Sequence, residues 1–129
     1  MTALLLDTHA WAWSLVDPDL LSDTARDAIE GAQSAFLSPI SLYEICQKVR
    51  LGRWDAMAPY TGELPDLVRQ QGLQTAELSH AVARHAALRD WAHRDPFDPI
   101  LASTAELAGL VLVTKDRVFD EVPTVRTVW

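Results

Sequence analysis

Two short apolar stretches determine the fold that we expect for this chain, ALLL at residues 3–6 and LVLVT at residues 110–114. Neither stretch alternates between apolar and polar residues, as a strand with one face in solvent would do. We therefore expect two strands that are buried on both faces. Short apolar runs and helical patterns alternate along the rest of the chain, which indicates an α/β fold, a parallel sheet with helices on both faces.

Two of the expected helices begin beside acidic residues. Ser41 and Glu44 have the spacing of a capping box, which predicts a helix over residues 42–51. Asp98 followed by Pro99 is typical of an N-cap and a first helical residue, which predicts a helix that runs to residue 108. The remaining patterns predict helices over 9–16, 23–32, 60–71 and after Ser79, and strands over 35–38, 73–78 and 125–128.

The composition limits the class of protein. The chain has 129 residues, 49% of them hydrophobic, and one cysteine, so we expect a single folded domain over residues 1–129 without disulfides. No apolar run approaches the roughly 18 residues that cross a bilayer. The first apolar run ends at Asp7 and has no basic segment before it, which is not typical of a signal peptide. We expect a cytoplasmic protein that does not enter a membrane.

The net charge bears on the kind of partner. Eighteen Asp and Glu residues outnumber eleven Lys and Arg residues, which gives a net charge of −7. Proteins that bind nucleic acid through phosphate contacts usually carry the opposite balance. An acidic chain is compatible with such a partner only if several acids gather in one place and hold cations there.

Several acids fall where the expected strands end or where the following helices begin. In a parallel α/β sheet, ligands bind at the carboxyl ends of the strands. We therefore expect these acids to converge on one edge of the sheet. They are Asp7 after the first strand, Glu44 in a first helical turn, Asp98 with Asp95 at the start of the helix before the 110–114 strand, and Asp116 after that strand.

Each acid also has a purely structural interpretation. Glu44 can complete the capping box, Asp98 can be an N-cap, and Asp7 and Asp116 can close turns. These separate roles do not explain why all the acids fall at one edge. Carboxylates that lie close together repel unless a cation compensates them. All-oxygen ligands favour Mg²⁺ or Mn²⁺ over zinc, which prefers cysteine and histidine.

A divalent ion held by carboxylates in an open cleft suits one reaction class. It can bind a phosphodiester oxygen and lower the pKa of a bound water that attacks phosphorus. The sequence has neither a Ser-His-Asp set nor a glycine-rich phosphate loop, which argues against acyl transfer and nucleoside triphosphate chemistry. The acids therefore favour metal-dependent cleavage of phosphodiesters.

Four motifs follow one another along the chain: LLLDTHAW at 4–11, SLYEI at 41–45 with Lys48 and Gly52 after it, HRDPFD at 93–98, and LVTKD at 112–116. Together they resemble the PIN-domain ribonucleases, and more narrowly the VapC-type toxins of bacterial toxin–antitoxin pairs. The resemblance implies a PIN-like three-layer α/β/α sandwich around a central parallel sheet. It also implies an endoribonuclease that depends on Mg²⁺ or Mn²⁺.

The resemblance assigns roles to the acids. Asp95 matches an additional acid of the subgroup with this His-x-Asp-Pro-Phe-Asp signature, and is a further candidate metal ligand. The acids that match the metal-binding catalytic residues of the family are Asp7, Glu44, Asp98 and Asp116.

Neighbouring residues match less closely. Thr114 matches a hydroxyl residue that precedes the last acid, and we expect it and Thr8 to support the acids. Pro99 stands where the subgroup usually has a basic residue, which removes one expected phosphate contact. Lys48 lies four residues after Glu44 and also fits an ion pair with it. The candidates for RNA contacts are Arg94, Lys115, Arg117 and Lys48.

The same resemblance implies partners. A small VapB-type antitoxin is expected to cover the cleft with its C-terminal segment, and a homodimer is expected. The chain has five tryptophans, a residue type that is enriched at interface anchors. They fit such partners, but they fit a partly buried core equally well.

Two other functions stay open at this stage. One is a non-catalytic PIN-fold module that only docks a protein partner, against which the near-complete set of acids argues. The other is a phosphotransfer domain of the receiver or haloacid-phosphatase type. A haloacid phosphatase needs Asp two residues after its first Asp, where this chain has His9, and no late Lys pairs with an acceptor Asp as in a receiver.

Overall fold

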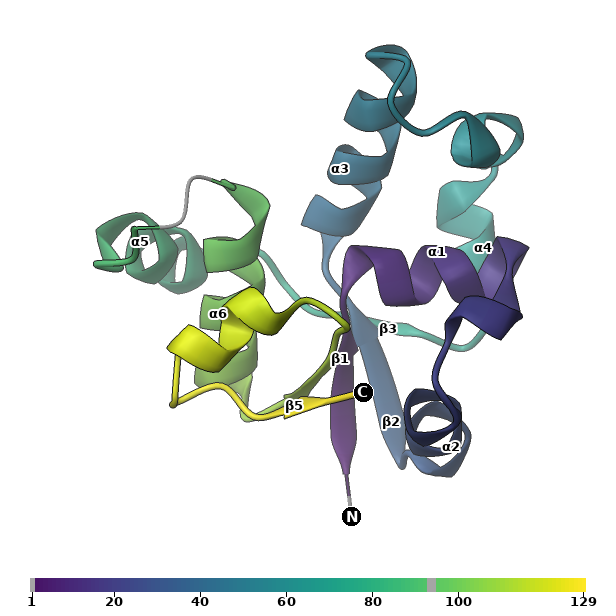
Figure 1. Cartoon of the computed structure of the whole chain (residues 1–129). Helices are drawn as coiled ribbons and strands as arrows, with labels where there is room; N and C mark the ends of the chain where they lie inside the picture. The colour runs from purple at the N-terminus through teal and green to yellow at the C-terminus, as the bar shows by residue number, and fades with distance from the viewer. Residues whose placement is uncertain (1, 93–94) are drawn as a thin grey trace.

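The two apolar stretches lie side by side at the centre of a sheet in the computed structural model, which describes residues 2–92 and 95–129 (Figure 1). In this part of the chain the sheet has five strands in the order β3-β2-β1-β4-β5, and every pairing is parallel. The expectation of a parallel sheet is confirmed. The strands are β1 (Ala3–Leu6), β2 (Ser34–Leu37), β3 (Gln74–Thr75), β4 (Val111–Val113) and β5 (Thr127–Val128).

The unbroken apolar sequence of β1 is explained by cover on both of its faces. Leu4 and Leu6 belong to one buried cluster and Leu5 belongs to a second. Figure 1 shows the helices of the two outer layers on opposite sides of the sheet, with α1 (Thr8–Val16), α2 (Asp23–Gly31) and α4 (Leu64–Gln70) on one side, and α5 (His80–Leu88) and α6 (Phe97–Ala108) on the other. The molecule is therefore a three-layer α/β/α sandwich.

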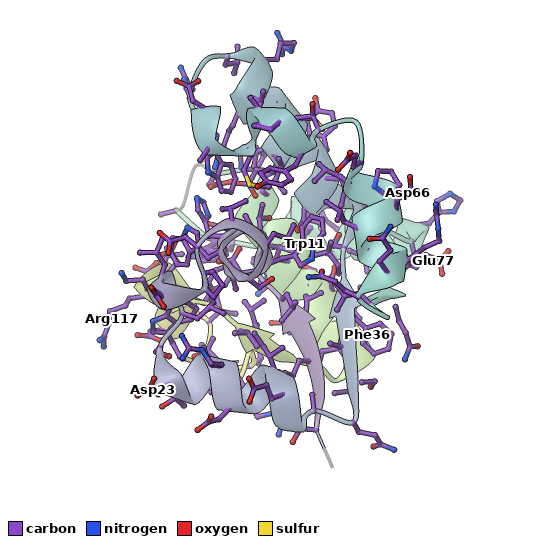
Figure 2. All side chains as sticks on the ribbon, turned by 90° about the vertical axis from the view of Figure 1, so that its right-hand side faces the viewer. Trp11, Asp23, Phe36, Asp66, Glu77 and Arg117 are labelled. Carbon is purple, nitrogen blue, oxygen red and sulfur yellow. The ribbon has the colours of Figure 1, made fainter. Side chains whose placement is uncertain are left out.

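The long helix α3 (Pro39–Arg50) extends beyond the carboxyl ends of the strands (Figure 1). Trp11 of α1, labelled in Figure 2, is fully buried, and its indole N–H donates a 2.6 Å hydrogen bond to Gln71 at the end of α4. Short 3₁₀ turns complete the fold: η1 (Pro18–Leu20), η2 (Asp55–Tyr60) and η3 (Arg117–Glu121). No helix within residues 2–92 and 95–129 is long and apolar enough to cross a membrane.

The start of α3 corrects one sequence prediction. The helix begins at Pro39, and its N-cap is Ser38, whose hydroxyl accepts a 3.2 Å hydrogen bond from the Ile40 N–H. Ser41 is therefore no N-cap, and the capping box with Glu44 is wrong. Several serines precede the apolar run, and Pro39 at the first helical position decides between them because its missing N–H costs nothing there.

The start of α6 corrects a second prediction. The helix begins at Phe97, so Asp98 lies inside the first turn rather than at the N-cap. Asp95 takes over part of that role, because its carboxylate accepts a 2.8 Å hydrogen bond from the Phe97 N–H. The first four N–H groups of a helix lack intrahelical acceptors, so Pro99 fits the third position as well as the first. The Asp-Pro pattern therefore does not fix the start.

Other boundaries differ by a few residues. The helix expected over 60–71 is shortened to α4, with Tyr60 as the last residue of η2, and the strand expected over 73–78 is reduced to β3. Gly109 ends α6 with a φ of 68°, a left-handed conformation that favours glycine.

The strand order determines where a ligand can bind. The chain passes from β1 to β2 and β3 on one side, and later adds β4 and β5 on the other side of β1. The direction of winding therefore reverses between β1 and β4. In open α/β sheets a crevice forms at such a point, outside the carboxyl ends of the strands.

Candidate functional site

A cavity of about 310 Å³ opens beyond the carboxyl ends of β1 and β4, at the point where the winding reverses. Its lining combines negative charge with two ammonium groups and two aromatic rings. The lining residues are Asp7, His9, Trp13, Glu44, Lys48, Asp95, Asp98, Lys115 and Asp116. All five acids singled out in the sequence thus meet at one place. They come from segments that lie far apart along the chain, around residues 7, 44 and 95–116.

Asp7 lies deepest among these acids, directly after the central strand. Its backbone N–H continues the sheet with a 3.0 Å hydrogen bond to the Val113 carbonyl, and its side chain is 7% exposed. Burial raises the pKa of the carboxyl group to about 6, against the lowering effect of a hydrogen bond from Thr114; the negative charges of Glu44 and Asp116 raise it further. Among the described residues, no positive charge compensates the Asp7 carboxylate.

Glu44 extends into the cavity from α3 and is buried, with 4% of its surface exposed. Its carboxylate forms an ion pair with the Lys48 ammonium one turn later on the same helix. This is the ion pair that the spacing predicted. Lys48 also lines the cavity, so it neutralises one of the five acids directly.

Thr114 connects the ends of β1 and β4. Its hydroxyl donates a 2.7 Å hydrogen bond to Asp7 and accepts a 3.0 Å hydrogen bond from the Asp116 N–H. One oxygen of Asp116 in turn accepts a 3.0 Å hydrogen bond from the Val118 N–H and caps η3. The structure thus places Thr114 beside the acids, where the sequence predicted it.

Asp95 and Asp98 reach the cavity from the start of α6. Asp98 is 7% exposed and lies in the first helical turn, where the helix dipole favours negative charge. Asp95 is half-buried, and one of its oxygens is engaged by the Phe97 N–H. The dipole supplies roughly half an elementary charge at this helix end.

The other predicted residues lie at different distances from the acids. Thr8 is buried and donates a 2.8 Å hydrogen bond to Ser41, so it joins α1 to α3 and does not line the cavity. Lys115 lines the cavity. Arg117 does not: its side chain is 91% exposed, projects outward in Figure 2, and lies 3.4 Å from an Asp120 oxygen. Arg94 lies outside the described residues.

Two aromatic residues of the lining were not assigned to the site from sequence. His9 and Trp13 lie four residues apart on α1, which begins directly after Asp7. Positions four apart share one face of a helix, so this spacing after the first acid is the signal that could have found them. Burial lowers the pKa of His9, and the nearby Lys48 charge adds to this effect.

The donor set fits a hard divalent cation. Five carboxylates line the cavity, and oxygen ligands of this kind suit Mg²⁺ or Mn²⁺. In the described parts of the chain, no three His, Cys, Asp or Glu side chains are already arranged as a coordination group. The Glu44 carboxylate is instead engaged by the Lys48 ammonium.

Comparison with known proteins agrees with this geometry. The family model described as the PIN domain matches residues 4–125, a range that includes every acid of the cavity. The chain belongs to the PIN-domain family. This PIN domain is 32% identical over 120 residues to Ribonuclease VapC22 of Mycobacterium tuberculosis, across 91% of this chain and 89% of the relative. The resemblance to VapC-type members is thus confirmed.

Solved structures share the fold of this PIN domain. One is a DNA-bound VapBC from Salmonella typhimurium, with a TM-score of 0.67 and 21% identity over 98% of this chain and 97% of that chain. Another is a toxin–antitoxin complex from Klebsiella pneumoniae, with a TM-score of 0.62 and 22% identity over 95% of this chain and 94% of that chain.

Proposed function

We propose that this PIN domain is an endoribonuclease that depends on Mg²⁺ or Mn²⁺ and acts as the toxin of a VapBC-type pair. The observation that carries the proposal is the convergence of Asp7, Glu44, Asp98 and Asp116 on one cavity at the reversal of the sheet. The similarity to a relative named as a ribonuclease supports RNA as the substrate.

The four acids would hold the divalent ion, and Asp95 is a further candidate ligand. Such an ion, when bound, supplies Lewis-acid stabilisation and lowers the pKa of a water molecule. The chain's own residues prepare the site. Thr114 holds the Asp7 carboxylate in position, and the first turn of α6 presents Asp98 to the cavity.

Lys48 and Lys115 are the described cations that line the cavity. We propose that Lys48 exchanges partners in the reaction. Its ammonium neutralises Glu44 in this structure, and it would become available for an RNA phosphate if Glu44 held a metal ion. Water attack on phosphorus with departure of the 3′ oxygen would leave 5′-phosphate and 3′-hydroxyl ends. Arg94 and Arg117 stay predictions as further RNA contacts.

The partner proposal rests on the structural relatives. The Salmonella structure is described as VapBC and the Klebsiella structure as a toxin–antitoxin complex, and this PIN domain shares the fold of both. We propose a VapB-type antitoxin that covers the acidic cavity and so blocks cleavage. The homodimer and the cytoplasmic location expected from the sequence stay predictions.

A cleavage assay tests the proposal. The unsubstituted chain should cut unpaired RNA with Mg²⁺ and not with EDTA, and Asp7→Asn should lower the rate by at least about 100-fold, as expected for a group that stabilises the reacting charges. The matched control is Asp66→Asn, which changes an exposed acid on α4 outside the cavity (Figure 2). Undiminished cutting by Asp7→Asn, or in EDTA, would refute the mechanism and favour a non-catalytic binding module.

A further inference from the structure

Three aromatic rings form a continuous wall beside the acids. The His9 imidazole stacks on the Trp54 indole with ring centroids 4.6 Å apart and an interplanar angle of 23°. Trp13 lies on the other flank of His9, with centroids 5.6 Å apart and an angle of 58°. We call His9, Trp13 and Trp54 the aromatic wall. Its two members on α1 line the same cavity as the catalytic acids.

The aromatic wall packs against the hydrophobic core on one side and borders the cavity on the other. Trp13 and Trp54 pack against the buried cluster that contains Trp11, and Trp129 contacts Trp13 edge-on at 5.8 Å. All three residues of the wall are nevertheless only half-buried. Core packing explains one side of each indole. It does not explain why an imidazole and an indole on successive helical turns complete the lining of a cavity whose other lining residues are all charged.

Two ammonium groups accompany the rings. Lys48 Nζ lies 5.8 Å from the Trp54 ring centroid, and Lys115 Nζ lies 5.8 Å from the Trp13 ring centroid. Both lysines also line the cavity. A ligand that stacks a flat ring on this wall therefore finds a cation within reach at either end.

We propose that the aromatic wall stacks the base of an unpaired nucleotide next to the phosphate that is cut, with Lys48 and Lys115 at the flanking phosphates. A nucleotide offers both groups that the surface accommodates, a π face and an anionic oxygen. A base inside a duplex already has both faces covered, so the wall selects single-stranded RNA or an unpaired loop. This inference rests on the proposed nuclease function and adds a residue-level basis for its substrate class.

A protein segment is the competing occupant of the same surface. An apolar side chain would use the rings but not the two ammonium groups, whereas a nucleotide uses both. The observations therefore favour RNA.

Binding without cleavage gives the first test. The Asp7→Asn chain is titrated into a labelled single-stranded RNA of mixed sequence, with fluorescence anisotropy as the readout, and a duplex of the same length serves as the comparison. We expect Trp13→Leu in this background to weaken single-strand binding by roughly tenfold or more, the range of one base–aromatic stack. Trp13→Phe should restore most of the affinity because it keeps a ring.

Tyr60→Leu is the matched control. Tyr60 is another half-buried aromatic residue that packs against the same cluster but does not line the cavity. The Tyr60→Leu substitution should leave the affinity for single-stranded RNA unchanged. If Trp13→Leu does not fold, as judged by its melting curve, His9→Leu provides the same test from the other member of the wall that lines the cavity. The proposal would be overturned by equal affinity for duplex and single strand. It would also be overturned if neither Trp13→Leu nor His9→Leu weakened binding.

An abasic substitution provides the second test. Removing the base next to the cut site should weaken binding by roughly tenfold when Trp13 is present, and by much less in Trp13→Leu, since coupled partners are not additive. If the losses of affinity from the abasic substitution and from Trp13→Leu were additive, the stacking proposal would be overturned. The two proposals fail differently: cleavage that does not depend on Trp13 refutes the wall and keeps the nuclease, while Trp13-dependent binding by a chain that never cuts RNA refutes the nuclease.

Discussion

Thr114 donates a 2.7 Å hydrogen bond to Asp7, although the two residues lie 107 positions apart in the chain. The contact joins the carboxyl ends of β1 and β4, on either side of the point where the winding of the sheet reverses. It fixes the orientation of the most deeply placed acid of the cavity. The same hydroxyl also accepts a hydrogen bond from the Asp116 N–H, so one side chain sets the positions of two acids.

Removing the Thr114 hydroxyl should therefore change both the unfolding free energy and the cleavage rate. Thr114→Val keeps the shape but removes the hydrogen bond, which should cost about 1–3 kcal/mol of unfolding free energy because a buried carboxylate loses a donor. The pKa of Asp7 should rise further, since the Thr114 bond lowers it. Urea unfolding and the cleavage rate report the two effects. Thr114→Ser retains the hydroxyl, and a loss as large as that of Thr114→Val would contradict this account.

The Asp7 carboxylate should destabilise the folded chain in the absence of metal. It is buried, close to the charges of Glu44 and Asp116, and it forms no ion pair with a cation in residues 2–92 and 95–129. In EDTA at neutral pH, Asp7→Asn should unfold at a higher temperature than the unsubstituted chain, by an amount worth about 1 kcal/mol. Saturating Mg²⁺ should reverse this order, because only the carboxylate gains from bound ions. A lower melting temperature for Asp7→Asn in EDTA would oppose the prediction.

Lys48 should affect metal binding and RNA binding in opposite directions. Lys48→Met removes the partner of Glu44, which leaves a buried carboxylate unpaired and should destabilise the metal-free chain by about 1–3 kcal/mol. The freed Glu44 should bind Mg²⁺ more tightly, while RNA affinity falls. Calorimetric metal titration and RNA anisotropy measure the two changes. Arg50→Met, an exposed charge on the same helix, is the control; weaker Mg²⁺ binding in Lys48→Met would count against the proposed exchange.

Glu106 should make the stability of the outer helical layer depend on pH. Burial raises the pKa of this carboxyl group, but hydrogen bonds from Arg89 at 2.5 Å, Thr124 and His85 at 2.8 Å outweigh it and lower the pKa to about 2. Because the folded pKa lies below the unfolded one, the stabilisation is present above about pH 4.5 and is lost as the pH falls toward 2.

Glu106→Gln tests that dependence. It should lower the unfolding free energy by about 1–2 kcal/mol at pH 7, given partial exposure and screening. The difference from the unsubstituted chain should shrink as the pH falls below about 4.5. Urea titrations at several pH values measure it, with the exposed Glu77→Gln as control. A difference that stays constant down to pH 2 would exclude Glu106 as its source.

The sequence predicted the sheet because burial on both faces leaves an unbroken apolar run, as in β1 and β4. It also predicted that the acids meet, since carboxyl ends of parallel strands share one edge. Helix starts were less predictable. Ser38 and Ser41 both precede an apolar residue: Pro39 favours Ser38, which caps α3, while Ser41 accepts a hydrogen bond from the Thr8 hydroxyl.

The orientation of individual side chains was not predictable from spacing alone. Lys115 and Arg117 are both cations near the last acid, yet Lys115 lines the cavity and Arg117 points to solvent because η3 begins between them. Trp13 fits a core position as well as a binding surface in a sequence pattern. Only the packing shows that it serves the core on one side and the cavity on the other.

If acids from distant segments hold a divalent ion in one cavity, calorimetric titration with the metal should detect its binding. We expect Mn²⁺ and Mg²⁺ to bind the unsubstituted chain, with the heat lost in Asp7→Asn and in Asp116→Asn and retained in Asp66→Asn. Binding that is absent from the unsubstituted chain, or that survives both cavity substitutions unchanged, would contradict the account.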